Sequence, residues 1–99
     1  MTAMEEITGR IAGQLTITHD VILRGTVQGD AWVTGGAALT LYGLVAGDLH
    51  VDEGGCAIVR GTVSGAVINK GGRVQVFGTV GEVTGFGTTH VDEYARVMR

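Results

Sequence analysis

The chain has 99 residues, of which 44% are hydrophobic and 17% are charged. This composition predicts one folded domain and excludes an intrinsically disordered chain. The formal net charge is −3 and no basic cluster exceeds two residues, so no partnership with nucleic acid is expected. The chain contains 18 glycines and no proline, which excludes collagen and favours tightly turned β-structure.

The N-terminal segment and the cysteine content bear on localisation. MTAMEEITGR is acidic and lacks an apolar stretch, so we expect no secretory signal. No apolar run approaches the roughly 20 residues that a membrane-spanning helix needs. The single Cys56 cannot form an intramolecular disulfide bond, which favours a reducing compartment. These features predict a cytoplasmic protein without a membrane span.

A glycine-valine phrase recurs along the chain. It is LRGTVQGDAWV at 23–33, LYGLVAGDLHV at 41–51 and VRGTVSGAVI at 59–68. A weaker copy opens earlier, at Gly9. The glycines that open the later copies are almost evenly spaced: Gly25, Gly43, Gly61 and Gly78. The last interval is shorter by one position than the two before it. A nearly fixed period of this length, without a helical pattern inside it, predicts a β-solenoid.

Apolar and polar side chains alternate within the copies. From residue 7 to residue 67 the odd positions are apolar or glycine, apart from His19 and Glu53, which we expect at corners facing water. Because the repeat spans an even number of positions, the inward residues of one coil stack on those of the next. The expected columns are Val27–Val45–Val63, Leu23–Leu41–Val59 and Val33–Val51.

The expected fold class is therefore all-β, a single-stranded parallel β-helix of about 18 residues per coil with three faces. Residues 7–85 would form about four coils after a short N-terminal tail, residues 1–6. Double glycines would form the corners, where the chain needs positive φ. After Gly72 the apolar positions shift to even numbers, which indicates the loss of one corner residue.

The two ends of this solenoid look different in sequence. Residues 86–99 form a capping segment for which we expect a short amphipathic helix, because Thr89 and Asp92 resemble a capping box. Its apolar stripe, which could instead engage a partner, comprises Val91, Tyr94, Val97 and Met98. The first coil looks uncovered, so we expect the self-assembly end there, at Ile7, Ile11, Leu15 and Ile17.

Several outward positions are apolar, and they recur at the repeat spacing. One column contains Trp32, and a second alternates arginine with aromatic residues, which suits cation–π stacking. Such columns can stabilise stacked strands, or they can form a lateral contact surface centred on Trp32. The candidate lateral interface consists of Trp32, His50, Ile68, Ile22, Ile58, Tyr42 and Phe77.

No catalytic constellation is visible. A six-residue period inside each copy raises the hexapeptide acyltransferases and the related trimeric zinc carbonic anhydrases, but zinc needs convergent ligands. The spacing of the three histidines does not match the repeat, so His19, His50 and His90 share no column. We therefore expect no enzyme activity, metal, cofactor or small-molecule substrate.

The recurrent G-T-V-x-G with flanking aliphatic residues, from LRGTVQGDAWV to VFGTVGEV, resembles the bactofilins, which are bacterial polymer-forming cytoskeletal proteins. The resemblance covers about residues 7 to 83. It implies a right-handed three-faced β-helix, end-to-end assembly without nucleotide, and scaffold roles in cell shape or protein placement.

Two departures from the bactofilin pattern stand out. The flexible N-terminal tail is nearly absent, and the helix-like C-terminus could block one end, which favours a limited oligomer, such as a dimer through the N-terminal coil. The alternative hypothesis is a small protein-binding module, for example an immunity protein that neutralises a toxin through its Trp32 face.

Overall fold

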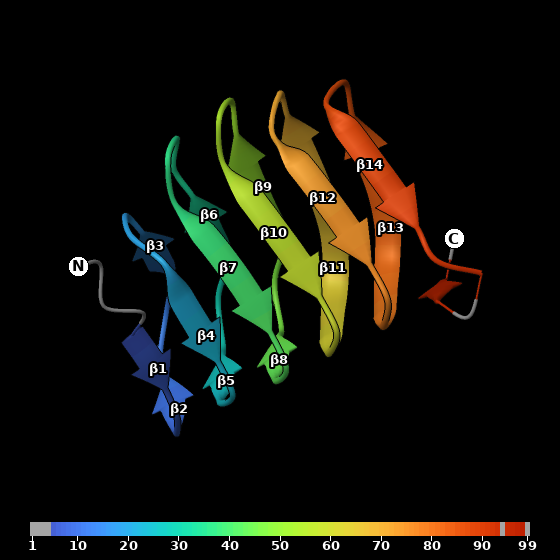
Figure 1. Cartoon of the computed structure of the whole chain (residues 1–99). Helices are drawn as coiled ribbons and strands as arrows, with labels where there is room; N and C mark the ends of the chain where they lie inside the picture. The colour runs from blue at the N-terminus through green and yellow to red at the C-terminus, as the bar shows by residue number, and fades with distance from the viewer. Residues whose placement is uncertain (1–4, 94, 99) are drawn as a thin grey trace.

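The computed structural model describes residues 5–93 and 95–98, which wind into about five coils of a parallel β-solenoid (Figure 1). The first three coils have three short strands each: β1 (Glu5–Ile7), β2 (Arg10–Ile11), β3 (Leu15–Ile17), β4 (Val21–Leu23), β5 (Thr26–Val27), β6 (Ala31–Val33), β7 (Ala38–Leu41), β8 (Leu44–Val45) and β9 (Leu49–Asp52). The later coils contain β10 (Cys56–Val59), β11 (Thr62–Lys70), β12 (Arg73–Val76), β13 (Thr79–Gly85), β14 (Thr88–Val91) and β15 (Arg96–Val97). Of these, β11 and β13 are longer and continue around a corner from one face to the next.

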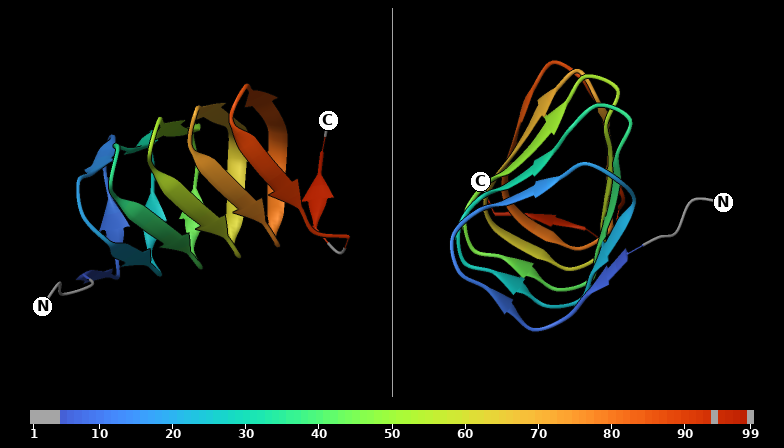
Figure 2. Two further views of the ribbon diagram at one scale, coloured as in Figure 1. Left: turned by 45° about the horizontal axis from the view of Figure 1, so that its top comes forward. Right: turned by 90° about the vertical axis from the view of Figure 1, so that its left-hand side faces the viewer.

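The strands form three faces around a narrow core, and Figure 2 shows the three-sided outline along the axis. Face A contains β1, β4, β7, β10, β12 and β14. Face B contains β2, β5, β8, the first parts of β11 and β13, and β15. Face C contains β3, β6, β9 and the later parts of β11 and β13. Every pairing between these strands is parallel, as the sequence predicts.

The predicted columns are confirmed by the strand register. Val27 pairs with Val45, and Val45 pairs with Val63, so each step along the column is one full repeat. The other two predicted columns also form, and the inward residues of the middle coils are almost completely buried: Val21, Leu23, Val27, Ala31, Val33, Leu39, Leu41, Val45, Leu49, Val51, Ala57, Val59, Val63, Val67, Val74, Val76 and Val80. The even-numbered members near the C-terminus confirm the predicted shift of phase.

The prediction of a C-terminal helix in residues 86–99 is wrong. Residues 86–93 and 95–98 contain no helix; β14 pairs with β12 and β15 pairs with β13, so the solenoid continues. Val91 stacks on Val76 and Val97 on Val80. The β-branched threonine and valine side chains of β14 fit a pleated strand better than a helix. Tyr94, the fourth residue of the expected helical stripe, lies outside the described residues.

The length of a coil varies toward the C-terminus, and this variation hides the repeat in the sequence. Ala57 and its partner Val74 are 17 positions apart, Val67 and Val83 are 16 apart, and Val74 and Thr89 are 15 apart. Val80 and Val97 are again 17 apart. Residues are lost at the corners, where β11 and β13 also change register between Val63 and Ala66. Without a constant period, the spacing of the last apolar residues matched a helix by coincidence.

The first coil begins earlier than expected. Glu5 and Glu6 belong to β1, and Glu6 pairs with Ile22 of β4, so the solenoid includes two residues assigned to the tail. Their carboxylates contact the outer wall: Glu6 binds Arg24 at 2.9 Å and Glu5 binds His19.

Among the described residues, no helix is long and apolar enough to cross a membrane.

Asn69 is the buried polar residue of the core, and its side chain holds a corner together. Its Oδ1 accepts hydrogen bonds from the backbone N–H groups of Gly71 and Gly72, at 3.2 and 2.8 Å. Its Nδ2 donates to Thr88 O and Thr89 Oγ1, at 2.9 and 3.0 Å. The buried amide is therefore fully paired, and it links the corner after β11 to β14 of the last coil.

The corner between faces A and B depends on glycines that allow close backbone contact. A Cβ at Gly61 would lie 2.1 Å from Gly43 O and 2.7 Å from Tyr42 C. Gly61 does not have a positive φ, so space and not backbone conformation requires glycine there. At the corner after β6, by contrast, Gly36 has a φ of 83° and open space around its Cβ position.

We expect Gly61→Ala to lower the free energy of unfolding by about 3 kcal/mol, because the neighbouring backbone must move. Gly36→Ala is the matched control and should cost about 1 kcal/mol, since only the left-handed conformation is disfavoured. Chemical denaturation of both variants measures the difference. Equal losses would contradict the close-contact explanation.

Candidate functional site: the solenoid ends and the outer wall

The N-terminal end consists of β1, β2 and β3, and it contains the four candidate assembly residues. Ile7, Ile11 and Leu15 are partly buried and pack against the core. Ile17 is only 1% exposed and cannot contribute surface to a contact. The structure therefore places three of the four candidates where a partner could cover them.

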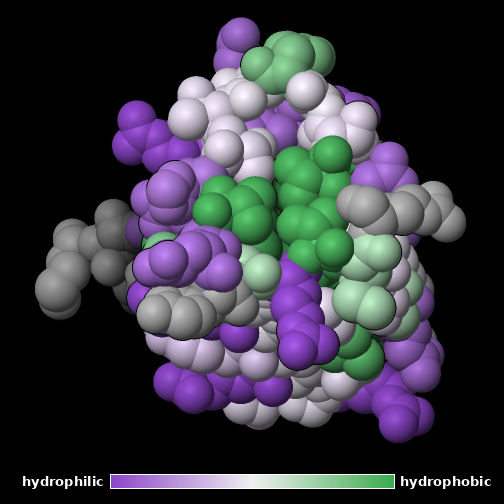
Figure 3. All heavy atoms as spheres, turned by 90° about the vertical axis from the view of Figure 1, so that its right-hand side faces the viewer, coloured by the Kyte–Doolittle hydropathy of each residue, from purple (hydrophilic) through white to green (hydrophobic). Residues whose placement is uncertain are grey.

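The C-terminal end is open and more apolar than the sequence suggests. Val91 and Val97 are 39% and 37% exposed, and Met98 is 70% exposed. Phe86, in the loop between β13 and β14, is 81% exposed. Figure 3 shows an apolar group at the centre of this end. Val91 and Val97 therefore cover Val76 and Val80 of the coil before them, but together with Met98 they remain exposed themselves.

Both ends also have strand edges. β1 and β14 are the outermost strands of their six-stranded sheet, and β15 is the last strand on face B. The outer side of each of these strands has no partner strand within the described part of the chain. A strand edge of this kind is a template for pairing with another chain. Neither end has a helix across it within the described residues.

The outer wall contains the candidate lateral residues, but it does not bring them into one patch. The Trp32 column, with His50 and Ile68, lies on face C. The other four belong to face A or to the corner that follows it: Ile22, Ile58, Tyr42 and Phe77.

The four aromatic members of this set each contact a side chain of a neighbouring coil. The rings of Trp32 and His50 stack with centroids 4.4 Å apart and planes 5° apart. The guanidinium of Arg24 lies 4.9 Å from the centre of the Tyr42 ring, and Arg60 lies 4.9 Å from that of Phe77. Parallel stacking and cation–π contacts between neighbouring coils stabilise the wall. The outer columns therefore have a structural role whether or not they bind a partner.

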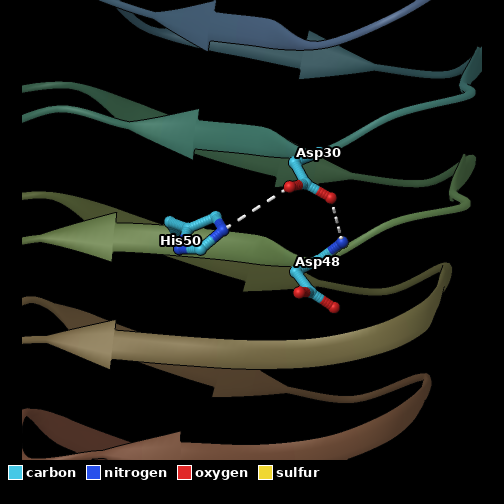
Figure 4. Close-up of side chains that lie close together, drawn as sticks. All are labelled: Asp30, Asp48 and His50. Atoms are coloured by element: carbon cyan, nitrogen blue, oxygen red, sulfur yellow. Dashed lines mark hydrogen bonds and ion pairs between the residues drawn. The ribbon is translucent and has the colours of Figure 1, made fainter.

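The sequence analysis missed a polar cluster at the corner between faces B and C. Asp30 and Asp48 occupy the same place in successive coils, and His50 follows on β9 (Figure 4). Asp30 Oδ1 accepts the backbone N–H of Asp48 at 2.8 Å, and Asp48 Oδ1 accepts that of Ala66 at 2.9 Å. His50 Nε2 lies 3.8 Å from Asp30 Oδ2.

A signal for this cluster was present in the repeated phrase. GDAWV and GDLHV place an aspartate at the same corner of two coils, and the second adds a histidine two residues later. Positions two residues apart on a strand face the same side. A search for histidines alone could not find this group.

The comparisons with known proteins leave the function to be argued from this geometry. No family model matches the chain, and neither the curated proteins nor the solved structures gave a match.

Proposed function

We propose that this protein is a cytoplasmic, non-enzymatic scaffold that assembles with itself through the ends of its solenoid, as the resemblance to the bactofilins implies. The observation that carries the proposal is the open C-terminal end. The described large hydrophobic residues that are exposed are Phe86, Val91, Val97, Met98 and Tyr42, and all except Tyr42 belong to this end. Exposed apolar groups gathered in one place are typical of a contact surface.

End-to-end stacking suits the construction of the solenoid. A second copy placed on the last coil would pair with the free edges of β14 and β15 and bury Val91 and Val97 against its own end residues. The same backbone hydrogen bonds and aliphatic stacking that join two coils within the chain would then join two chains. Assembly is thus an extension of folding, with no nucleotide needed.

The absence of a capping helix across the described C-terminal residues changes the size of assembly that we propose. A capped end would stop growth at a dimer through the N-terminal coil, formed by Ile7, Ile11 and Leu15. With apolar strand edges at both ends, each copy has two contact surfaces. We therefore propose an extended polymer in place of the dimer.

Charged substitutions at the ends should dissolve the assembly. We expect Val97→Asp at the C-terminal end and Ile11→Asp at the N-terminal end to convert polymers to small species, because each would bury an unpaired carboxylate in the contact. Val97 is the cleaner site, since its exposure lets the monomer fold with aspartate in place. Sedimentation velocity over a concentration series and negative-stain microscopy measure the outcome, with circular dichroism to verify folding.

Tyr42→Asp provides the matched control. Tyr42 is 47% exposed, similar to Val97, but it lies on the wall of the middle coils. It should leave the assembly intact. A wild-type protein that stays monomeric at all concentrations would overturn the proposal, and loss of assembly in Tyr42→Asp alone would point to lateral association.

Trp32→Ala separates the scaffold from the alternative hypothesis of a binding module. If the Trp32 column serves the wall, the variant should lose about 1 kcal/mol of unfolding free energy through the lost His50 stack, and its assembly should be unchanged. Thermal unfolding and sedimentation measure these two quantities. Unchanged stability would indicate that Trp32 serves a partner and not the wall.

A further inference from the structure

The polar cluster at the corner between faces B and C has the composition of a metal site. One ligand atom each from Asp30, Asp48 and His50 lie within 4.8 Å of one another. The three residues come from adjacent coils, and all three are partly buried. Figure 4 shows the imidazole directed at the Asp30 carboxylate, with Asp48 beside it.

The distances suit a shared ion better than a direct hydrogen bond. His50 Nε2 is 3.8 Å from Asp30 Oδ2, whereas N–H···O bonds measure about 2.7–3.2 Å. An ion bound to both atoms at about 2.0–2.2 Å spans such a gap with an obtuse angle at the metal. The structural hydrogen bonds of the two aspartates use Oδ1, which leaves each carboxylate with a second oxygen.

The charge of the cluster favours a cation. Two carboxylates in successive coils repel each other, and like charges opposed across strands destabilise a sheet. Among the ion pairs of the described residues, Asp30 has only His50 and Asp48 has none, so no lysine or arginine neutralises them there. A divalent ion would remove this repulsion.

The position of His50 is fixed by its neighbours. Its ring is stacked on Trp32 and its side chain is only 13% exposed. The nitrogen that faces Asp30 is Nε2. A neutral imidazole that carries its proton on Nδ1 offers the lone pair of Nε2 to an ion.

We propose that Asp30, Asp48 and His50 bind one divalent transition-metal ion at this corner, independently of assembly. One imidazole nitrogen with carboxylate oxygens suits Zn²⁺ and its first-row neighbours, whereas Ca²⁺ and Mg²⁺ favour oxygen ligands alone. The ion would tie the second and third coils together across their corner. This assigns a metal site where the sequence alone gave no expectation of one.

The test uses the single tryptophan of the chain as a built-in probe. Because Trp32 stacks on His50, Co²⁺ bound to His50 should quench the tryptophan fluorescence, and Zn²⁺ should displace it and restore the signal. Calorimetry with Zn²⁺ alone should give one ion per chain, counted per chain in any oligomer. His50→Phe keeps a ring for the stack, and Asp48→Asn keeps the Oδ1 acceptor for Ala66; each should weaken Zn²⁺ binding by about tenfold or more.

His90→Ala is the control for the variants, since His90 is exposed on β14, far along the solenoid from the cluster, and its loss should change neither titration. Absence of Zn²⁺ binding by the wild-type chain would overturn the proposal without any variant. Quenching that survives both His50→Phe and Asp48→Asn would overturn it too, and so would displacement of Co²⁺ by Ca²⁺ as readily as by Zn²⁺. If one variant fails to fold, the other and the wild-type titration still decide.

Discussion

Backbone hydrogen bonds directed along the solenoid axis are the interaction on which everything else depends. The N–H groups of Tyr42, Arg60 and Phe77, for example, each donate to a carbonyl of the preceding coil, at 2.7–2.8 Å. These bonds fix the register, and the register places like side chains one above another. The aliphatic core, the stacked rings of the wall and the paired aspartates at the corner are all consequences of that register.

The sequence predicts the middle of the molecule well because two independent signals agree there. Strict alternation defines the inward side, and a constant repeat with an even number of positions stacks one inward side on the next. Both signals weaken where corners lose residues, as between Val67 and Val83 or between Val74 and Thr89. The strand β14 was therefore interpreted as part of a helix, because Val91 and Val97 lie farther apart in the chain than their partners Val76 and Val80.

The candidate sites were harder to predict than the fold, for a different reason. The periodicity predicts which residues are neighbours, but it does not predict whether a neighbouring side chain covers each of them or leaves it exposed. Trp32 and Tyr42 are outward in sequence and could have been a bare surface; in the structure each has a neighbour, His50 or Arg24, above or below it. Val97 and Met98 looked like a cover and instead remain exposed. The aromatic side chains of the wall thus contact one another or an arginine, whereas apolar side chains at the C-terminal end stay exposed.

Asn69 fixes the C-terminal end of the solenoid through hydrogen bonds made inside the core. Its buried amide reaches β14 directly, through Thr88 and Thr89, so the outermost strand of face A is anchored from within the core. These hydrogen bonds are made inside the coil, so a substitution on the outer wall leaves them in place. Loss of the Asn69 amide, by contrast, would release the outermost strand of face A and the corner after β11 together.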